Sequence, residues 1–380
     1  MQHVDVLIAG GGVVGSACAW FLRREAPQLT VLVAEPDPSY RAAASTLSAS
    51  SIRQQFSTPL NIAMSAFGLE FLRNAGIRMT KSRYLYLVDA AGAAALQSRV
   101  KLQQSCGVSV QWHEPRALAA RYPWLNTTDL AGGSDTREGE GWFDGHSLLQ
   151  YLRQDNERNG IAYRAARLEH FERGADGRVT SAALSDGTRI RCGHLINSTG
   201  THSRRIAALA GIDLPVQPRK RCVFVFTSPA RLAPDALLID PSGLWFRPEG
   251  DRYITGHTPA DDRDVAVDDF EVEHGAFEDV LWPILAHRVP GFEEAKVTGA
   301  WAGHYDYNVF DQNAFIGPAP GAANLLLASG FSGHGLQHSP AVGRALAEWI
   351  AHGRYRTLDL SPLGFDRMLQ RSPVVETNVI

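Results

Sequence analysis

Cysteine and lysine are both scarce in this chain of 380 residues. The four cysteines, Cys18, Cys106, Cys192 and Cys222, lie far apart and form no CxxC or Cys/His ligand spacing, which gives little support to a metal site or a disulfide framework. We expect four buried thiols in a reducing compartment. Only four of the 37 basic residues are lysines, so arginine carries most of the positive charge.

Neither sign of charge dominates, and no apolar run is long enough to cross a membrane. The 37 lysines and arginines nearly balance the 40 aspartates and glutamates, so the chain has no positive field that would attract nucleic acid. The apolar N-terminal stretch is broken by three glycines and lacks a basic leader region and a cleavage site. These absences predict a cytoplasmic protein without a nucleic-acid partner or a transmembrane segment. They leave peripheral membrane contact open.

The composition itself is typical of a soluble globular protein. Hydrophobic residues make up 44% of the chain and charged residues 20%. A length of 380 residues exceeds that of one ordinary domain. We therefore expect two domains, or one large domain that carries an insertion.

The first 35 residues have the pattern of a βαβ unit. Residues 4–9 form a short apolar run that suits a buried parallel strand, residues 13–24 continue as a helix with a basic last turn, and residues 30–34 form a second strand. Together they make one unit of about thirty residues.

Gly10, Gly12 and Gly15 form G-x-G-x-x-G between the first strand and the helix. The tight turn, the approach of the backbone to a pyrophosphate and the close helix–strand contact each exclude a side chain. Glu35 ends the second strand, where a carboxylate can accept both hydroxyls of an adenosine ribose. The pattern predicts a dinucleotide site; the alternative is a tight turn beside a solvated glutamate. The expected cofactor contacts here are Gly10, Gly12, Val13, Val14, Gly15 and Glu35.

The choice between FAD and NAD rests on later glycine segments. The Rossmann pattern stops after residue 35 and resumes only near residues 193–200 and 325–335. The second segment holds three glycines before a helix that is expected to have Ser339 as its cap, Pro340 in its first turn and Gly353 past its end. A helix dipole there stabilises the negative charge of a reduced flavin. This favours FAD over NAD. The alternative is that the second glycine segment is an ordinary loop that binds no cofactor.

The rest of the chain alternates short strands with a few helices. Helices are expected over residues 61–73 and 147–159, the second with Ser147 as its N-cap. Ser185-Asp186-Gly187 separates two strands as a hairpin turn. Short alternating strands recur through residues 215–318, separated by Pro, Gly and Asp clusters, and they fit a mostly antiparallel sheet.

Several segments resemble the D-amino-acid-oxidase-like superfamily of FAD-dependent oxidoreductases, which includes sarcosine and glycine oxidases and D-amino acid dehydrogenases. They are residues 10–35, Ser45-Thr46-Leu47-Ser48-Ala49-Ser50, Asn197-Ser198-Thr199-Gly200 and Ser329-Gly330-Phe331-Ser332-Gly333-His334-Gly335. Residues 301–317 and 331–344 are most similar to FAD-dependent oxidoreductase-domain-containing proteins, whose mitochondrial relatives are linked to the assembly of respiratory complex I.

The resemblance implies a fold that combines α/β and α+β parts. A discontinuous, Rossmann-like FAD-binding domain would carry an inserted, mostly antiparallel β-sheet substrate domain. The FAD-binding domain would comprise residues 1–79, 140–214 and 319–380. The substrate domain would comprise residues 80–139 and 215–318.

The resemblance also implies contacts with FAD. The flavin diphosphate and ring would lie against Ser45, Thr46, Ser48, Ala49, Ser50 and Ser51. Leu168 would offer its backbone to the adenine side, and Thr199 and Gly200 would close over the diphosphate. The pyrimidine edge of the flavin would lie against Gly330, Phe331, Ser332, Gly333, His334 and Gly335.

Two departures from sarcosine oxidase are visible. That enzyme attaches its flavin through a cysteine just before a tyrosine, whereas residues 301–305, Trp-Ala-Gly-His-Tyr, contain no cysteine, so noncovalent FAD is expected. It also places a lysine above the flavin to promote reaction with oxygen, and residues 252–257 contain none. Oxygen and a quinone or other electron-transfer acceptor both stay open.

A substrate carboxylate buried against a flavin needs a cation or a phenol to pair with it. Arg53 is the first candidate, the alternative being a surface arginine. Tyr305 stands where the resembling D-amino acid dehydrogenases have an arginine, and Gln337 where sarcosine oxidase has a lysine. Trp245, Tyr253 and Tyr305 could form the wall of an amine pocket, with core packing as the alternative.

These observations predict an enzyme that oxidises an amine or amino acid to an imine by hydride transfer to flavin N5. The substrate would be of the D-amino acid, glycine or N-methyl amino acid type, and the expected catalytic residues are Arg53, Tyr305 and His304. Two alternatives stay open. One is a flavoprotein with little or no activity that acts as an assembly partner of a respiratory complex, and the other is a 2-hydroxy acid dehydrogenase.

Overall fold

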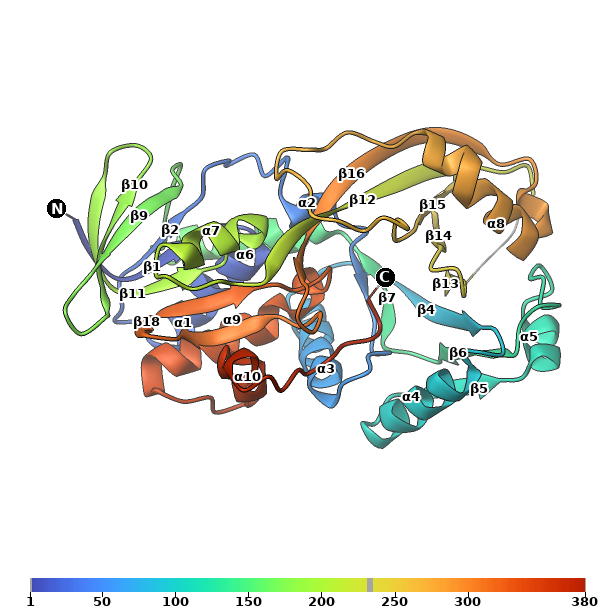
Figure 1. Ribbon diagram of the computed structural model, residues 1–380, viewed down its shortest axis with the longest axis horizontal. Helices are drawn as coiled ribbons and strands as arrows, with labels where there is room; N and C mark the ends of the chain where they lie inside the picture. The colour runs from blue at the N-terminus through green and yellow to red at the C-terminus, as the bar shows by residue number, and fades with distance from the viewer. Residues whose placement is uncertain (1, 231–234, 380) are drawn as a thin grey trace.

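The computed structural model describes residues 2–230 and 235–379. Two mixed β-sheets lie side by side, and helices pack on each of them (Figure 1). This is the combination of a Rossmann-like part and a second, largely antiparallel sheet that the sequence predicts. The residue limits of the two domains stay a prediction.

The first sheet has eight strands, and its central path runs β17-β18-β11-β1-β2-β8. Its strands are β1 (Gln2–Ala9), β2 (Val31–Ala34), β8 (Ala162–Arg164), β9 (Leu168–Arg173), β10 (Val179–Leu184), β11 (Arg189–Asn197), β17 (Phe315–Ala319) and β18 (Ala322–Ser329). The pairs from β18 to β8 are parallel, whereas β17 and the β9–β10 hairpin are antiparallel.

Alternate residues of the parallel strands face opposite sides of the first sheet. Val6 and Ile8 of β1 pack in one core cluster, whereas Leu7 and Ala9 pack in another. Both faces are covered, which explains why the strands read as continuous apolar runs. The helices of this part are α1 (Val13–Glu25), α2 (Ala44–Leu47), α3 (Pro59–Asn74), α6 (Gly145–Arg158), α7 (Ser203–Ala208), α9 (Gly335–His352) and α10 (Asp366–Leu369), with the short turns η1 (Gly200–His202) and η4 (Ser361–Leu363).

The second sheet has ten strands, and its main path runs β16-β12-β15-β14-β13-β4-β6-β5. Its strands are β3 (Ser51–Ile52), β4 (Met79–Val88), β5 (Val110–His113), β6 (Gly132–Thr136), β7 (Glu140–Phe143), β12 (Val216–Thr227), β13 (Ala236–Ile239), β14 (Trp245–Glu249), β15 (Arg252–Gly256) and β16 (Lys296–Asn308). All of the pairs are antiparallel except β13 with β4. Its helices are α4 (Ala93–Ser105), α5 (Pro115–Arg121), the π-helical η2 (Phe277–Leu281), α8 (Trp282–Arg288) and η3 (Pro290–Phe292).

The two faces of the second sheet differ in what covers them. Leu85 and Phe246 point into an apolar core shared with α5 and α8. Tyr84 and Trp245, each one residue earlier on its strand, belong to a separate cluster on the opposite face. The two-residue period of a strand thus decides which of the two clusters each aromatic side chain joins.

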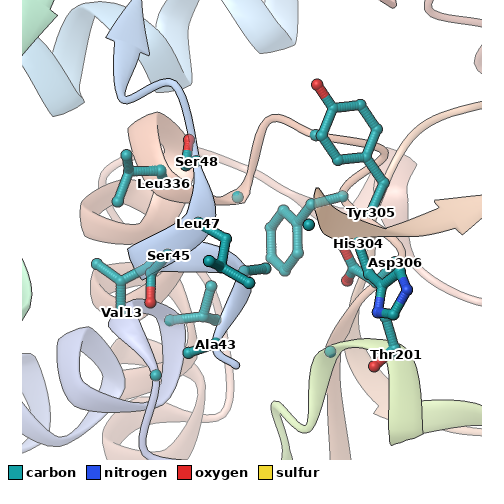
Figure 2. A pocket seen from close by; sticks show the side chains of 18 of the residues that line it. Val13, Ala43, Ser45, Leu47, Ser48, Thr201, His304, Tyr305, Asp306 and Leu336 are labelled. Atoms are coloured by element: carbon teal, nitrogen blue, oxygen red, sulfur yellow. The ribbon is translucent and has the colours of Figure 1, made fainter. Parts of the chain in front are cut away.

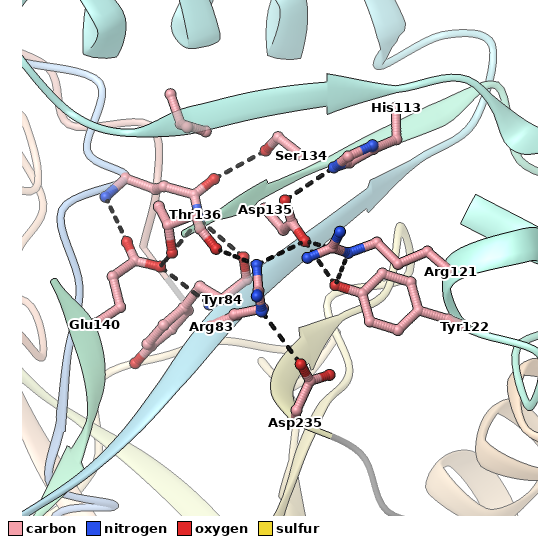
Figure 3. Close-up of polar contacts among 12 residues, drawn as sticks. Arg83, Tyr84, His113, Arg121, Tyr122, Ser134, Asp135, Thr136, Glu140 and Asp235 are labelled. Carbon is pink, nitrogen blue, oxygen red and sulfur yellow. Dashed lines mark hydrogen bonds and ion pairs between the residues drawn. The ribbon is translucent and has the colours of Figure 1, made fainter. Parts of the chain in front are cut away.

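A buried polar network ties the outer strands of the second sheet together (Figure 3). Asp135 accepts hydrogen bonds from His113 (2.8 Å) and the Tyr122 hydroxyl (2.7 Å), and it pairs with Arg121 at 2.9 Å. Burial alone would raise the pKa of Asp135, but these partners bring it below its ordinary value. This carboxylate therefore stabilises the packing of β5, β6 and α5 rather than a binding site.

Two helix starts differ from those that the sequence predicts. Helix α6 begins at Gly145, and its N-cap is Asp144, which accepts from the backbone N–H of His146 at 3.0 Å. Ser147 is inside the first turn and donates to Asp144 instead. An earlier aspartate therefore takes the role that was expected of the serine.

Helix α9 begins at Gly335, so Ser339 and Pro340 lie inside it rather than at its start. Pro340 cannot donate to the carbonyl of Leu336, and the hydroxyl of Ser339 donates to that carbonyl at 3.0 Å. The serine thus compensates for the proline. The predicted end is confirmed, because Gly353 closes the helix with a φ of +68°.

The cysteines also differ in part from expectation. Cys18 and Cys192 are buried, whereas Cys106 is exposed and Cys222 is half-buried, and all four are free thiols. In the described ranges, no helix is long and apolar enough to cross a membrane, and no three His, Cys, Asp or Glu side chains gather as metal ligands would.

Helices α1 and α9 approach closely at Gly343. A Cβ on this residue would lie 2.6 Å from the carbonyl carbon of Ala17 and 2.8 Å from its oxygen. Backbone atoms cannot move aside as a flexible side chain can, so the contact requires glycine.

Replacing Gly343 with alanine is expected to lower the free energy of unfolding by about 1–3 kcal/mol, because the added methyl group enters a packed contact. In an isolated helix the same change would stabilise by about 1 kcal/mol, so the sign is diagnostic. Urea unfolding measures it. The reverse exchange at an exposed position in the first turn of α4, Ala94→Gly, is the control and should cost up to about 1 kcal/mol through helix propensity alone. A stabilised Gly343→Ala protein would contradict the contact.

Candidate active site

A deep cavity lies between helix α2 and strand β16 (Figure 2). Its volume is about 780 Å³, which is in the range of sites for small molecules and cofactors. Its walls include Gly10 and Glu35 from the first sheet region and Tyr84 and Trp245 from the second. The cavity therefore joins the two parts of the molecule.

The N-terminus of α1 opens into this cavity. Gly12 precedes the first helical turn, and no side chain caps it, which leaves backbone N–H groups free to bind an anion. A Cβ at Gly10 would lie 2.4 Å from the carbonyl oxygen of Ser198, so only glycine fits there. Gly15 lies outside the cavity wall. A Cβ on it would be 1.9 Å from the carbonyl oxygen of Gly10, so this glycine permits the contact between turn and helix.

Glu35 is held at the end of β2 with its carboxylate at the cavity. One carboxylate oxygen accepts from the N–H of Gly11 (2.8 Å) and the other from the N–H of Asp37 (2.9 Å). Burial raises the pKa of Glu35, and these two N–H groups partly offset the effect. Each oxygen keeps a second lone pair, so the carboxylate can still accept the hydroxyls of a ribose.

Three buried hydroxyl groups near the cavity have no hydrogen-bond partner among the described residues. They belong to Tyr40, Ser45 and Thr46. Tyr40 and Ser45 line the cavity, and Thr46 follows Ser45 in helix α2. An unpaired buried hydroxyl costs about 1–3 kcal/mol, so a group of them indicates a ligand that supplies the missing partners.

The second glycine segment, residues 330–335, joins β18 to α9 at the same cavity. Gly333 has a φ of +90°, and a Cβ on it would lie 2.6 Å from the ring of Tyr305. His334 precedes α9 without a side-chain cap, so a second free helix N-terminus is available. The predicted contacts of this segment that line the cavity are Phe331, Gly333, His334 and Gly335, whereas Gly330 and Ser332 lie outside the wall.

Asp306 fixes the turn that contains Gly330 and Ser332. Its carboxylate accepts from the N–H of Gly330 at 2.7 Å, and its carbonyl accepts from the N–H of Ser332 at 3.1 Å. The Ser332 hydroxyl accepts from the N–H of Asn308 at 3.0 Å. Burial raises the pKa of Asp306 to about 6, more than the backbone N–H groups lower it. Gly330 and Ser332 therefore shape the turn.

The other predicted cofactor contacts also line the cavity: Val13, Val14, Ser48, Ala49, Ser50, Ser51, Leu168, Thr199 and Gly200. The carbonyl of Leu168 already accepts a hydrogen bond from Arg205 at 2.7 Å. The individual contacts of these residues with a cofactor stay predictions.

A family model described as DAO, FAD dependent oxidoreductase, matches residues 5–349. The chain belongs to this family. It is 40% identical to FAD-dependent oxidoreductase domain-containing protein 1 of Xenopus laevis, over 100% of this chain and 85% of that protein. It is 24% identical to mitochondrial dimethylglycine dehydrogenase of Rattus norvegicus, over 95% of this chain and 45% of that protein. The crystal structure of L-proline dehydrogenase from P. horikoshii has a TM-score of 0.86 at 20% identity, covering 98% of this chain and 99% of that one, which shows the shared fold.

FAD is the cofactor of the family, and the cavity fits it. The uncapped starts of α1 and α9 offer N–H groups to a diphosphate and to the polar edge of a flavin, and the unpaired hydroxyls offer further hydrogen bonds. Noncovalent attachment stays a prediction. Among the cysteines, Cys222 lines the cavity, and burial raises the pKa of its thiol.

Arg53 follows strand β3 and lines the cavity with only 4% of its surface exposed, so the alternative of a surface arginine is wrong. Its Nη2 contacts Nε2 of His334 at 3.0 Å and donates to the carbonyl oxygen of Asn378. Its Nε has no partner, and it forms no ion pair within the described residues. The guanidinium lies 4.6 Å from the ring centre of Phe56 and 5.9 Å from that of Tyr84.

Two neutral histidines stand beside this cation. Burial, the charge of Arg53 and the neighbouring His338 hold the pKa of His334 well below its usual value. Burial and Arg53 likewise lower the pKa of His338 to about 3. An unprotonated His334 can accept a hydrogen bond from Arg53, but neither imidazole supplies a counter-charge.

Tyr305 and His304 both line the cavity but leave β16 in opposite directions, as successive residues of a strand must (Figure 2). Tyr305 packs against Gly333, with the guanidinium of Arg221 at 5.1 Å from its ring centre. His304 contacts the carbonyl oxygen of Asp269 at 2.7 Å, and burial lowers its pKa. The two side chains therefore serve different parts of the cavity.

Of the three remaining candidates for substrate binding, two line the cavity and one does not. Trp245 lines the cavity. Gln337 also lines it, and its amide oxygen accepts from the N–H of Arg53 at 3.0 Å. The structure places Tyr253 away from the cavity, in the apolar core, with its ring 4.8 Å from that of Phe292. The two-residue period of β15 turns Tyr253 to the far face of the sheet.

The wall also contains residues that the sequence pattern does not predict. Tyr84 lines the cavity beside Arg53, and the alternation Tyr84-Leu85-Tyr86 was the signal that could have placed it there. Tyr40 and His257 also line the wall, but both follow strand ends in loops, where no periodicity indicates direction.

A pH dependence of stability follows from Asp306. Its pKa in the folded protein is about 6 against an ordinary value of 3.8, so between these values the folded state binds more protons than the unfolded chain. This contribution to the free energy of unfolding is full below about pH 4 and is lost as the pH rises through 6. Asp306→Asn removes the titration.

We therefore expect the difference in unfolding free energy between the wild type and Asp306→Asn to change by up to about 3 kcal/mol between pH 4 and pH 7. Urea unfolding at a series of pH values measures it. Asp251→Asn, in an exposed turn, controls for the loss of a carboxylate. Parallel pH curves for the wild type and Asp306→Asn would show that this carboxyl group titrates normally.

Proposed function

We propose that this chain oxidises an amine or amino acid that carries a carboxylate, and that Arg53 binds that carboxylate. The substrate would be of the D-amino acid, glycine or N-methyl amino acid type, and the product an imine. FAD, when bound, accepts the hydride from the carbon beside the nitrogen. The residues of the chain bind the substrate, orient that carbon and exclude water.

The observation that carries the proposal is the charge of Arg53, which forms no ion pair with any other residue in the ranges 2–230 and 235–379. A buried guanidinium without a counter-ion is strongly unfavourable. Burial disfavours its charged form, but neighbouring tyrosine and carboxylate groups outweigh that effect and raise the pKa of Arg53, so it is a cation at neutral pH. A substrate carboxylate would supply both the counter-charge and a fork-shaped acceptor for the guanidinium.

Aromatic side chains support an amine as the reacting group. Tyr84, Trp245 and Tyr305 line the same cavity as Arg53, and flat rings provide a closely packed wall for the carbon that is oxidised. Burial in the cavity disfavours the charged form of an amine. The substrate nitrogen would therefore lose its proton to solvent on binding, which frees the lone pair that hydride removal requires.

Two relatives are named for small amino acid derivatives, dimethylglycine dehydrogenase and monomeric sarcosine oxidase. Their names support the proposed substrate class. A 2-hydroxy acid would present the same carboxylate to Arg53, so it is the second candidate.

The lysines support a dehydrogenase over an oxidase. All four lie in the described ranges, and none lines the cavity. Lys220 instead pairs with Asp269 at 2.9 Å and Glu273 at 3.3 Å. His257 follows β15 at the cavity, and burial lowers its pKa. His257 belongs to residues 252–257, the segment compared above with the lysine-bearing segment of sarcosine oxidase. A neutral imidazole there lacks the positive charge with which a lysine would stabilise reduced oxygen. This favours a quinone or an electron-transfer protein as the acceptor.

Anaerobic mixing of the flavoprotein with amines, amino acids, N-methyl amino acids and 2-hydroxy acids tests the proposal. Bleaching of the flavin by a carboxylate-bearing amine is expected. Arg53→Met should weaken the apparent affinity for that substrate about 100-fold, because about 3 kcal/mol is lost with a buried charged partner. Arg53→Lys should retain part of it.

Arg252→Met is the matched control, because Arg252 is an exposed arginine on the same sheet, and its bleaching should equal that of the wild type. Bleaching by hydroxy acids alone would favour the second candidate. No bleaching across the panel would overturn the proposal and favour a non-catalytic partner role. Equal affinities for the wild type and Arg53→Met would show that Arg53 does not bind the carboxylate.

A further inference from the structure

The segment that carries Arg53 has no regular secondary structure between β3 and α3. Side chains from other elements accept hydrogen bonds from its backbone N–H groups. The N–H of Arg53 donates to Gln337 at 3.0 Å, and the N–H groups of Gln54 and Gln55 donate to Glu140 at 2.7 and 3.2 Å. The position of Arg53 is therefore set by buried side chains rather than by a helix or a strand.

A second group of contacts reaches the same segment from residues 373–379. This part of the chain leaves α10 and runs toward β7 (Figure 1). Its Glu376 is fully buried and accepts from the N–H and the hydroxyl of Ser57, at 2.9 and 2.7 Å, and from the amide of Asn61 at 2.9 Å. A carboxylate with this many donors firmly fixes the backbone at Ser57, at the far end of the segment that carries Arg53.

Asn378 contacts the segment at two points. Its side-chain amide donates to the carbonyl of Gln55 at 2.6 Å, and its own carbonyl oxygen accepts from Nη2 of Arg53. Its N–H donates to Glu376 at 2.9 Å, so the glutamate orders both the segment and the residue that holds the guanidinium.

The guanidinium nitrogens of Arg53 differ in whether the protein binds them. Nη2 is engaged by Asn378 and His334, whereas Nε has no partner within the described residues. A guanidinium is a planar fork whose donors point in fixed directions. Holding one end of the fork with protein acceptors decides where its free donors point.

We propose that Glu376 and Asn378 are positioning residues of the substrate site. They hold Arg53 in the orientation that presents its free donors to a substrate carboxylate. Residues 373–379 thus form part of the substrate site although they lie more than 300 positions from Arg53 in the sequence. The inference rests on the proposed role of Arg53.

Carboxylate binding in the absence of turnover tests it. Acetate and benzoate are titrated into the FAD-loaded protein, and their dissociation constants are read from the change in flavin absorbance. Glu376→Gln keeps the shape of the side chain but removes the charge and one acceptor, so we expect binding of both probes to weaken about 10-fold, while the flavin content stays that of the wild type. Glu348→Gln is the matched control, since Glu348 is equally buried but caps residues 356–357.

A double-mutant cycle separates positioning from a general loss of stability. If Glu376 acts through Arg53, Glu376→Gln should weaken probe binding much less in an Arg53→Lys background than in the wild type. An undiminished effect in that background would overturn the proposal, as would equal binding by Glu376→Gln and the wild type. If Glu376→Gln does not fold, Ser57→Ala takes its place under the same criteria; it removes the hydrogen bond from the Ser57 hydroxyl to Glu376 and the one that this hydroxyl accepts from the N–H of Thr377.

The two proposals fail in different ways. Weaker binding by Arg53→Lys with unchanged binding by Glu376→Gln would overturn the positioning role alone. If the wild type binds neither probe, or if Arg53→Lys binds both as the wild type does, the carboxylate role of Arg53 is wrong and the positioning role is overturned with it.

Discussion

The buried charge of Arg53 is the constraint on which the arrangement of the substrate site depends. Its guanidinium is surrounded by a neutral imidazole, a backbone carbonyl and two aromatic rings, none of which neutralises it. Glu140 and Glu376 do not contact the guanidinium but bind N–H groups of residues that follow Arg53, Gln54 and Ser57 respectively, and their charges raise its pKa from a distance. Low-dielectric surroundings make such a cation a strong binding site for an anion and a poor one for a second cation.

Holding that charge in place explains why so much buried polar structure converges on a short irregular segment. Backbone groups that no helix or strand satisfies must find side-chain partners when they are buried. Here the partners come from β7, α9 and residues 376–378, so the segment is fixed from several directions. A rotamer-rich arginine held this way loses little further freedom when a ligand binds.

The parts that the sequence predicts well are those that local pattern determines. The unit from Gly10 to Glu35 was placed correctly because strand, turn, helix and acid follow one another within one motif. Tyr253 was placed wrongly because alternation gives two faces of a strand but does not say which face meets the cavity. Glu376 and Asn378 could not be found at all, since their contacts with Ser57 and Arg53 span the length of the chain and follow no repeat.

Helix α9 connects the two halves of the site physically. Its uncapped start faces the cavity at His334 and Gly335, and His334 contacts Arg53 directly. Within the first turn, Gln337 accepts from the N–H of Arg53. Helix α9 is packed against α1 through the backbone contact at Gly343. A shift of α9 would therefore move both His334 and Gln337, which contact Arg53. The helix whose start lines the cavity thus also holds the backbone and the guanidinium of Arg53.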